Sequence, residues 1–304
     1  SLAKEGHIHG VIAVGGVTAL NVGRAVAAMF NEVHSFNTFL DGAQPNTNPI
    51  PCICVPSTYR TPFVFTNEVP ITDSRNHQVK LLKVQKNLCK LVLYDPNMTL
   101  TLTDNQKATL SIELISMAVE AYLSQKANFF SDTFVEKGLQ LLTYALDGSP
   151  SLDITTPEEI LLAQAGTMLS LATTSSSLGL ASLLSLTINS RYSIVKPLIS
   201  SILLPYMLED AAKYKSSQIV KLAKIMNCIP EDENPSSEEI CNYFIESIRQ
   251  RIAKANLPTR LKDLNLTIEQ LSLAVEDVKQ IDIVNTLPRS MSTDDIFDFV
   301  KKAY

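Results

Sequence analysis

Histidine is scarce in this chain and is missing from most of it. The 304 residues contain four histidines, at positions 7, 9, 34 and 77. Proteins that hold iron or zinc commonly do so through imidazole nitrogens. The part of the sequence after residue 77 therefore excludes a metal centre built on histidine.

Long apolar runs and blocks of like charge are also lacking. The formal net charge is −5, which argues against nucleic acid or an anionic membrane surface as the main partner. Spanning a bilayer takes roughly 18 to 20 apolar residues, and the longest candidate, 160–186, is interrupted by Gln164, Gly166 and a Thr/Ser cluster. Residues 1–10 lack a basic segment followed by an apolar core, so no signal peptide is expected.

Cysteines are few, and their number is odd. Five are present, with no spacing typical of a metal site. Cys52 and Cys54 alternate along a strand-like run, so their side chains share one face and are predicted to fill the core. A reducing, cytoplasmic compartment is the simplest expectation.

The first hundred residues predict an α/β region. Short apolar runs at 10–14, 51–55 and 88–94 are typical of buried strands, and 63–72 with 78–84 predicts a hairpin turning near 73–76. One amphipathic helix is expected at about 19–31. These strands are few for a complete nucleotide-binding sheet, so further N-terminal strands are expected to be missing, disordered or lost.

After residue 101 the pattern predicts helices. Residues 108–123 have helical apolar spacing. Helix starts are indicated by a polar N-cap residue followed three positions later by a capping acid or amide: Thr103 with Gln106, Thr156 with Glu159, Ser236 with Glu239, Thr267 with Gln270, and Ser292 with Asp295. We expect two domains, residues 1–103 and 104–304, joined near 101–106.

Several segments, in order, resemble the iron-containing (group III) alcohol dehydrogenase family. They are GVIAVGGVTALNVGR at 10–24, PCICVPSTYRTPFVFTNEVPITD at 51–73, LVLYDPNMTLTL at 91–102, ELISMAVEAYLS at 113–124, the 179–206 stretch ending in LLPY, and the 248–304 region with LPTRLKDL, NTLPR and STDDI. The resemblance implies a dehydroquinate synthase-like fold, in which a truncated Rossmann-like region with a parallel sheet precedes an all-α bundle. It also implies a homo-oligomer.

In the family that this sequence resembles, one Asp and three His bind the metal. All four of the corresponding positions hold other residues in this sequence. They hold Glu113, Met117, Ser182 and Lys196, and Leu186 replaces a further His. A thioether, a hydroxyl and a charged ammonium do not suit Fe²⁺ or Zn²⁺. No Fe or Zn is therefore expected.

Lys196 has two interpretations. In the structural one, it supplies a fixed positive charge where the metal would lie and pairs with Glu113, with their charged atoms within roughly 4 Å. In the functional one, Lys196 is a base with a depressed pKa, or it holds a carbonyl oxygen. The first is preferred.

The nucleotide site is weakened in the same way. The family's GGGS turn corresponds to Gly15, Gly16, Val17 and Thr18, so two glycines and a hydroxyl remain to hold a pyrophosphate at a helix N-terminus. Its AGTGSE stretch corresponds to residues 59–64, where proline and aromatics replace small residues. No cofactor is expected. NAD(P) is the one cofactor whose binding the remaining residues would still allow.

Three functions are consistent with this sequence. The preferred one is a catalytically inactive homologue, a pseudoenzyme kept for assembly, interaction with a protein partner or ligand sensing. The alternative is a divergent NAD(P)-dependent alcohol or aldehyde oxidoreductase that works without metal through Lys196. The third is a small-molecule-binding protein whose interdomain cleft is lined by Met117, Leu186 and Phe63.

Overall fold

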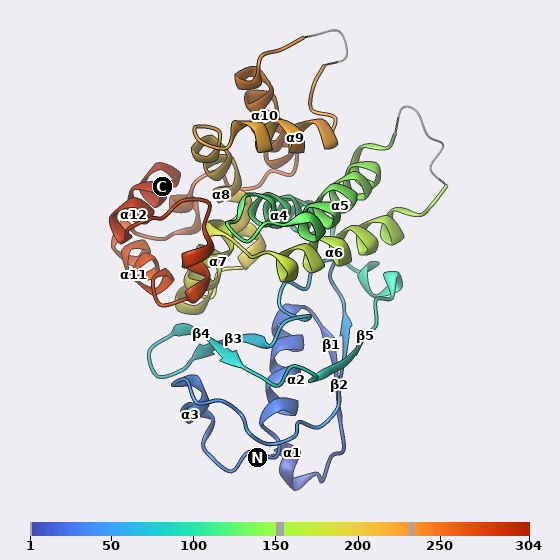
Figure 1. Cartoon of the computed structure of the whole chain (residues 1–304), viewed down its shortest axis with the longest axis vertical. Coiled ribbons are helices and arrows are strands. Elements are labelled where there is room, and N and C mark those ends of the chain that lie inside the picture. Colours follow the sequence, from blue (N-terminus) through green and yellow to red (C-terminus); the bar gives the residue numbers. More distant parts are fainter. Residues whose placement is uncertain (1, 150–154, 231–233) are drawn as a thin grey trace.

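The computed structural model describes residues 2–149, 155–230 and 234–304, and consists of an α/β region followed by a helical region (Figure 1). The α/β elements are α1 (Leu2–Glu5), β1 (Val11–Gly15), α2 (Val17–Met29), α3 (Phe36–Leu40), β2 (Cys52–Pro56), β3 (Glu68–Asp73), β4 (Gln78–Lys83) and β5 (Cys89–Val92). The helices that follow are α4 (Asp104–Leu123), α5 (Phe129–Asp147), α6 (Glu158–Ser175), α7 (Leu180–Tyr192), α8 (Lys196–Ala211), α9 (Ser216–Ile225), α10 (Ser237–Lys254), α11 (Ile268–Val278) and α12 (Thr293–Ala303). Short 3₁₀ turns occupy Pro96–Thr99, Leu261–Leu264 and Asp282–Thr286.

A three-stranded parallel sheet in the order β1–β2–β5 forms the centre of the α/β region. Val11 of β1 lies opposite Cys52 of β2, which in turn lies opposite Cys89 of β5. Cys52 and Cys54 are fully buried, as their alternation predicted. The parallel strands predicted from the apolar runs are therefore confirmed. Their predicted burial holds for β2 but was wrong for β1 and β5, where Ile12 and Leu91 are 69% and 50% exposed.

The predicted hairpin is present, but its first strand begins later than expected. β3 and β4 pair in antiparallel register, from Glu68 opposite Lys83 to Asp73 opposite Gln78. The residues from 62 to 67 form turns instead of extending the strand. In these turns the Val64 amide donates to the Thr61 carbonyl, at 3.2 Å. Pro62 lacks an N–H to donate to a sheet, so the chain turns here before it enters β3.

Helix α2 packs closely against β1 and leaves one edge of the sheet open. A Cβ atom at Gly23 would lie 2.5 Å from the Cβ of Ala13, so a glycine is needed for this contact. On the other side of β1, no described strand pairs with it. Ile12 and Val14 alternate with the buried Ala13 and so point to the other face of the sheet, where they are 69% and 51% exposed, so part of that face is uncovered.

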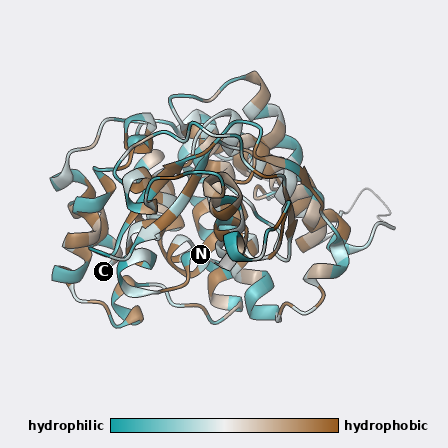
Figure 2. Cartoon of the chain, turned by 90° about the horizontal axis from the view of Figure 1, so that it is seen from below, coloured by the Kyte–Doolittle hydropathy of each residue, from teal (hydrophilic) through white to brown (hydrophobic). Residues whose placement is uncertain are grey.

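Helix α4 lies at the centre of the helical region. It contacts α5, α6, α7, α8, α9 and α10, and all its residues from Leu110 to Leu123 are buried. A helix that is buried on all sides needs small or apolar residues around its whole circumference, which the sequence of α4 supplies. Figure 2 shows brown, hydrophobic stretches toward the interior of the molecule and teal stretches on outer turns.

Most of the predicted helix starts are confirmed. Capping boxes form at Thr103, Ser236, Thr267 and Ser292. Helix α6 also begins close to its predicted start, at Glu158, but its predicted cap, Thr156, was wrong, because Pro157 itself occupies the N-cap position and no side chain caps the helix. Among the described residues no single helix is long and apolar enough to cross a membrane. Helices α6 and α7 together have the required length and composition, but they are bent by 98° relative to each other.

The two regions are joined by contacts as well as by the chain. Asp277 of α11 forms an ion pair with Arg191 of α7 and accepts a 2.8 Å hydrogen bond from the Gln78 side chain of β4. Ser190 of α7 donates to the backbone carbonyl of His77, at 2.9 Å. The β3–β4 hairpin is therefore fixed to the helical region, and the cleft described next lies between two parts held in a defined relation.

Candidate functional site

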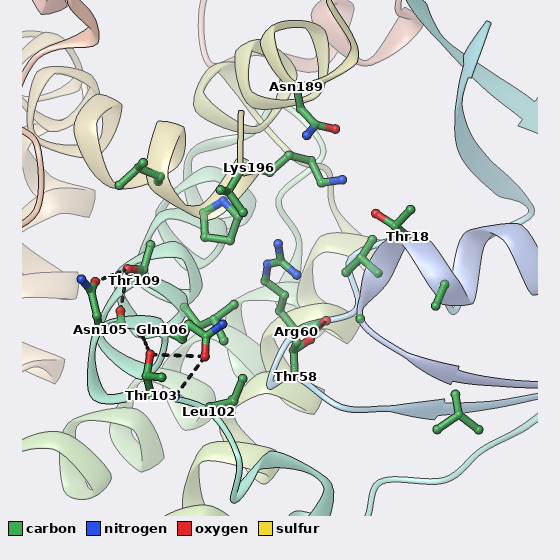
Figure 3. A pocket seen from close by; sticks show the side chains of 18 of the residues that line it. Thr18, Thr58, Arg60, Leu102, Thr103, Asn105, Gln106, Thr109, Asn189 and Lys196 are labelled. Carbon is green, nitrogen blue, oxygen red and sulfur yellow. Dashed lines mark hydrogen bonds between the residues drawn. The ribbon is translucent and has the colours of Figure 1, made fainter. Parts of the chain in front are cut away.

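A cleft of about 1300 Å³ lies between the α/β region and the helices. Its walls come from β1, the first turns of α2, the start of α4, the start of α8 and residues 256–258. Arg60 and Lys196 are the charged residues among the described residues that line it. Figure 3 shows both side chains extending into the same space, with Thr18 and Asn189 nearby.

The glycine turn leads into α2 at one side of this cleft. Gly15 has a φ of +140°, and Gly16 is the N-cap, with no side chain hydrogen-bonded to the first turn. Gly16 and Thr18 line the cleft, whereas Gly15 does not. Free backbone N–H groups at a helix N-terminus, together with the helix dipole, favour an anion. Val17, at the third position of this turn, is buried and also lines the cleft.

Arg60 is brought into the site by the segment that follows β2. The preceding residue, Tyr59, packs its backbone directly on α6, where a Cβ atom at Gly166 would lie only 1.6 Å from the Tyr59 carbonyl oxygen. The amide of Thr61 donates to the Ser170 hydroxyl at 3.0 Å. These two contacts with α6 fix the backbone on both sides of Arg60, so its side chain has a defined direction.

Glu113 pairs with Arg60 and not with Lys196. The Nε of Arg60 donates to Oε2 of Glu113, and the two side chains are only 6% and 9% exposed. Burial lowers the pKa of Arg60 to about 10, so its guanidinium stays protonated at neutral pH. The predicted Lys196–Glu113 pair was therefore wrong. Arg60, from the loop after β2, is the partner of Glu113 in the place of Lys196.

Lys196 is the first residue of α8, and no ion pair to it exists among the described residues. It lines both the large cleft and a small cavity of about 20 Å³ beneath it. Burial and the positive charge of Arg60 lower the pKa of Lys196 to about 8. A cation at a helix N-terminus is opposed by the helix dipole, so this lysine does not serve the stability of α8.

Met117 and Ser182 both line the small cavity, together with Leu186 and Phe63. Met117 is almost fully buried. The predicted lining of the large cleft by Met117, Leu186 and Phe63 was wrong. Helices α4 and α7 turn Met117 and Leu186 toward this small cavity, and Phe63 reaches it from the turns before β3.

Glu120, a buried carboxylate on α4 that the sequence analysis missed, holds Ser182. Its two oxygens accept from the Ser182 amide at 2.8 Å and from the Ser182 hydroxyl at 2.5 Å. Burial nevertheless raises the pKa of Glu120. This carboxylate takes the place of an N-cap for α7, whose own cap, Gly179, has no side chain. The sequence did contain a signal for Glu120. It lies seven residues, or two helical turns, after Glu113, so both carboxylates lie on the same face of α4.

The four positions that the resemblance assigns to metal ligands do not form a donor set for iron. The carboxylate of Glu113 is bound by Arg60, and the hydroxyl of Ser182 is bound by Glu120. Met117 offers a thioether, and Lys196 a cation without a lone pair. In the part of the chain that the structure describes, no group of three or more His, Cys, Asp or Glu side chains is arranged to hold a metal ion.

Comparisons with known proteins agree with the fold. Residues 1–96 match the family model for iron-containing alcohol dehydrogenase, and residues 107–304 match that for the C-terminal part of the Fe-containing alcohol dehydrogenase family. Lactaldehyde reductase of Escherichia coli (strain K12) is 21% identical over 296 residues, which cover 97% of this chain and 76% of that protein.

Solved structures show the same fold. Alcohol dehydrogenase from Oenococcus oeni superposes with a TM-score of 0.88 at 20% identity, covering 100% of this chain and 79% of that one. Sulfoacetaldehyde reductase from Bifidobacterium kashiwanohense, solved in complex with NAD⁺, superposes with a TM-score of 0.76 at 17% identity, covering 99% of this chain and 78% of that one. The fold is therefore an α/β region with a parallel sheet followed by a helical domain.

These matches correct the expectation that no cofactor is involved. Both family models are named for iron, and a reductase of this fold was solved with NAD⁺. The expectation was drawn from side chains, but pyrophosphate is held largely by backbone N–H groups, which a changed sequence still provides. The cleft beside Gly16 keeps a helix N-terminus with such groups, whereas the four ligand positions do not fit the metal. By its family models and its fold, the chain belongs to the iron-containing alcohol dehydrogenase family.

Proposed function

We propose that this chain is a catalytically inactive homologue of the iron-containing alcohol dehydrogenases, in which the fold is retained for binding a ligand or a protein partner. The observation that carries the proposal is the buried Arg60–Glu113 ion pair. It occupies the carboxylate that the resemblance assigns to the metal. A guanidinium in that place repels a divalent cation, and removing it leaves a buried carboxylate without a partner.

A second contact supports the same proposal. Ser182 is held by both oxygens of Glu120, so its hydroxyl points to a carboxylate at 2.5 Å and is not free to bind a ligand in the cavity. Two of the four positions are thus engaged by buried partners from within the chain. Glu113, Glu120 and Ser182 are fixed on α4 and α7, and Arg60 is fixed by the packing of residues 59–61 on α6, so these contacts persist unless the fold itself changes.

The test is a turnover assay with metal supplied. The purified protein is incubated anaerobically with Fe²⁺ or Zn²⁺ and assayed for oxidation of NADH and NADPH with a series of short aldehydes. Escherichia coli lactaldehyde reductase, treated identically, is the positive control. We expect no turnover by this chain above the rate without protein. Turnover that depends on the added metal would overturn the proposal.

One observation favours a second candidate, a divergent NAD(P)-dependent oxidoreductase. Lys196 has no carboxylate partner among the described residues, faces the cleft and has a pKa of about 8. Its ammonium group would donate a hydrogen bond to a carbonyl oxygen, which stabilises negative charge developing there. The nucleotide would then lie against Gly16 and Thr18, with Gly15 shaping the turn, as predicted from the sequence.

The two candidates differ in a direct measurement. The second requires aldehyde-dependent oxidation of NADH or NADPH without added metal, at a rate that falls at least a hundredfold in Lys196→Met. The matched control is Lys224→Met, because Lys224 is exposed on α9, away from the cleft. Loss of turnover in Lys196→Met alone establishes the oxidoreductase, and no turnover in any of the three proteins supports the inactive homologue.

A further inference from the structure

The inner end of the cleft carries an unbalanced positive charge. Arg60, Lys196 and Glu113 are the charged side chains among the described residues that line the cleft and the cavity beneath it. Glu113 is paired with Arg60. The charge of Lys196 is therefore left without a counter-ion from the described part of the chain.

The position of Lys196 is unfavourable for the fold itself. It is the first residue of α8, where the positive end of the helix dipole opposes a cation, and a second cation, Arg60, lies close enough to affect its ionisation. Removing a charge from water is costly unless it is paired. A bound anion would supply the missing partner.

Arg60 offers hydrogen-bond donors to the same space. Only its Nε is bonded to Glu113, and its two terminal amino groups have no partner among the described residues. Figure 3 shows this guanidinium and the Lys196 side chain reaching into the cleft from opposite walls. The planar edge of a guanidinium fits the two oxygens of a carboxylate, and an ammonium adds a point charge beside it.

The remainder of the cleft is largely apolar. Its lining includes Val17, Leu102, Leu110, Leu198 and Leu257. At about 1300 Å³ it is larger than a single anionic group requires, and cavities of several hundred cubic ångströms or more typically hold organic ligands. The occupant is therefore expected to have an apolar body attached to its charged end.

We propose that this cleft binds an organic monoanion, a carboxylate with an apolar body, with the carboxylate placed between Lys196 and Arg60. Glu113 neutralises one of the two cations, so a ligand with a single negative charge balances the other. A phosphate ester would bring a second negative charge, which has no partner here. The inference deepens the ligand-binding role proposed above, and in that respect rests on it. It is tested by binding and not by turnover, so either can fail alone.

The experiment compares three molecules with the same six-carbon body: hexanoate, hexan-1-ol and hexyl phosphate. Each is titrated into the purified full chain by calorimetry, and each is added in a thermal unfolding assay, where a ligand of the native state raises the Tm. We expect hexanoate to bind, and to bind at least tenfold more tightly than hexan-1-ol. We expect added NaCl to weaken hexanoate binding, since the interaction is between charges.

Two variants locate the site. Lys196→Gln should weaken hexanoate binding about tenfold or more, the usual loss when a charged hydrogen-bond partner is removed. Lys224→Gln, the matched exposed lysine on α9, should leave it unchanged. Removing an unpaired cation should not lower the Tm of Lys196→Gln. If that variant nevertheless does not fold, the salt dependence in the native protein decides.

The following results would overturn the proposal. Hexan-1-ol binding as tightly as hexanoate would show that charge has no part in recognition. Hexyl phosphate binding more than tenfold more tightly than hexanoate would exclude a monoanion site. Hexanoate binding that Lys196→Gln leaves intact, or that NaCl does not affect, would place the ligand elsewhere.

Discussion

Replacing Glu113 by methionine should destabilise the protein strongly, because it leaves the guanidinium of Arg60 buried without a counter-ion. The two side chains of this pair are 6% and 9% exposed. Removing one member of a pair buried to this degree costs about 3–5 kcal/mol. Lys196, a second cation facing Arg60, adds to the repulsion, so the cost should lie in the upper part of that range.

The double variant Arg60→Met/Glu113→Met provides the decisive comparison. With both charges gone, two apolar side chains of similar volume fill the same space. Such exchanges are neutral or stabilising by about 1–4 kcal/mol. The double variant should therefore be more stable than Glu113→Met, and the two substitutions should be strongly non-additive.

Urea unfolding followed by far-UV circular dichroism is a suitable assay, because the chain contains no tryptophan to report by fluorescence. Glu68→Met is the control, since Glu68 pairs with Lys83 with side chains 21% and 37% exposed. This exposed pair should contribute about 0–1 kcal/mol to the free energy of unfolding. A loss below about 1 kcal/mol for Glu113→Met, or a double variant less stable than Glu113→Met, would refute this account of the site.

Three further predictions concern the fold. Gly166→Ala should destabilise the protein by about 3 kcal/mol in urea unfolding, because its Cβ would overlap the Tyr59 carbonyl; unchanged stability would show that this contact relaxes freely. Hydrogen bonds from Arg75 lower the pKa of Asp73 to about 2, below the value of about 3.9 in the unfolded chain. The stability that the Asp73 carboxylate contributes is therefore present above pH 4 and is lost as the pH falls toward 2. In Asp73→Asn, the urea midpoint should vary less with pH over this range. Asp277→Asn should cost about 1–3 kcal/mol and speed amide hydrogen exchange in β4, and unchanged exchange would show that Asp277 does not hold the hairpin.

Much of the fold could be predicted from local patterns. The parallel strands are short apolar runs, and the capping pairs at Thr103, Ser236, Thr267 and Ser292 fix where four helices begin. These signals are local, because strand burial and helix capping depend on neighbouring residues. The errors are local as well. Phe63 belongs to an apolar run, but it follows a proline and lies in a turn.

The site could not be predicted as well, because its contacts join residues far apart in the sequence. Arg60 and Glu113 are separated by 53 positions, and Ser182 and Glu120 by 62. Lys196 lines the cleft but does not pair with Glu113. Its partner was misassigned because the sequence does not show which of two nearby cations reaches the carboxylate, and only the packing of residues 59–61 on α6 decides it.

The open strand β1 has a consequence for the cleft. Residues 11–14 of this strand are part of the cleft wall, while the backbone N–H and C=O groups along the same side have no partner strand among the described residues. Unpaired groups of this kind readily accept another polypeptide segment. A segment that paired with β1 would therefore lie beside the wall of the cleft, so protein association along β1 and ligand entry would influence each other.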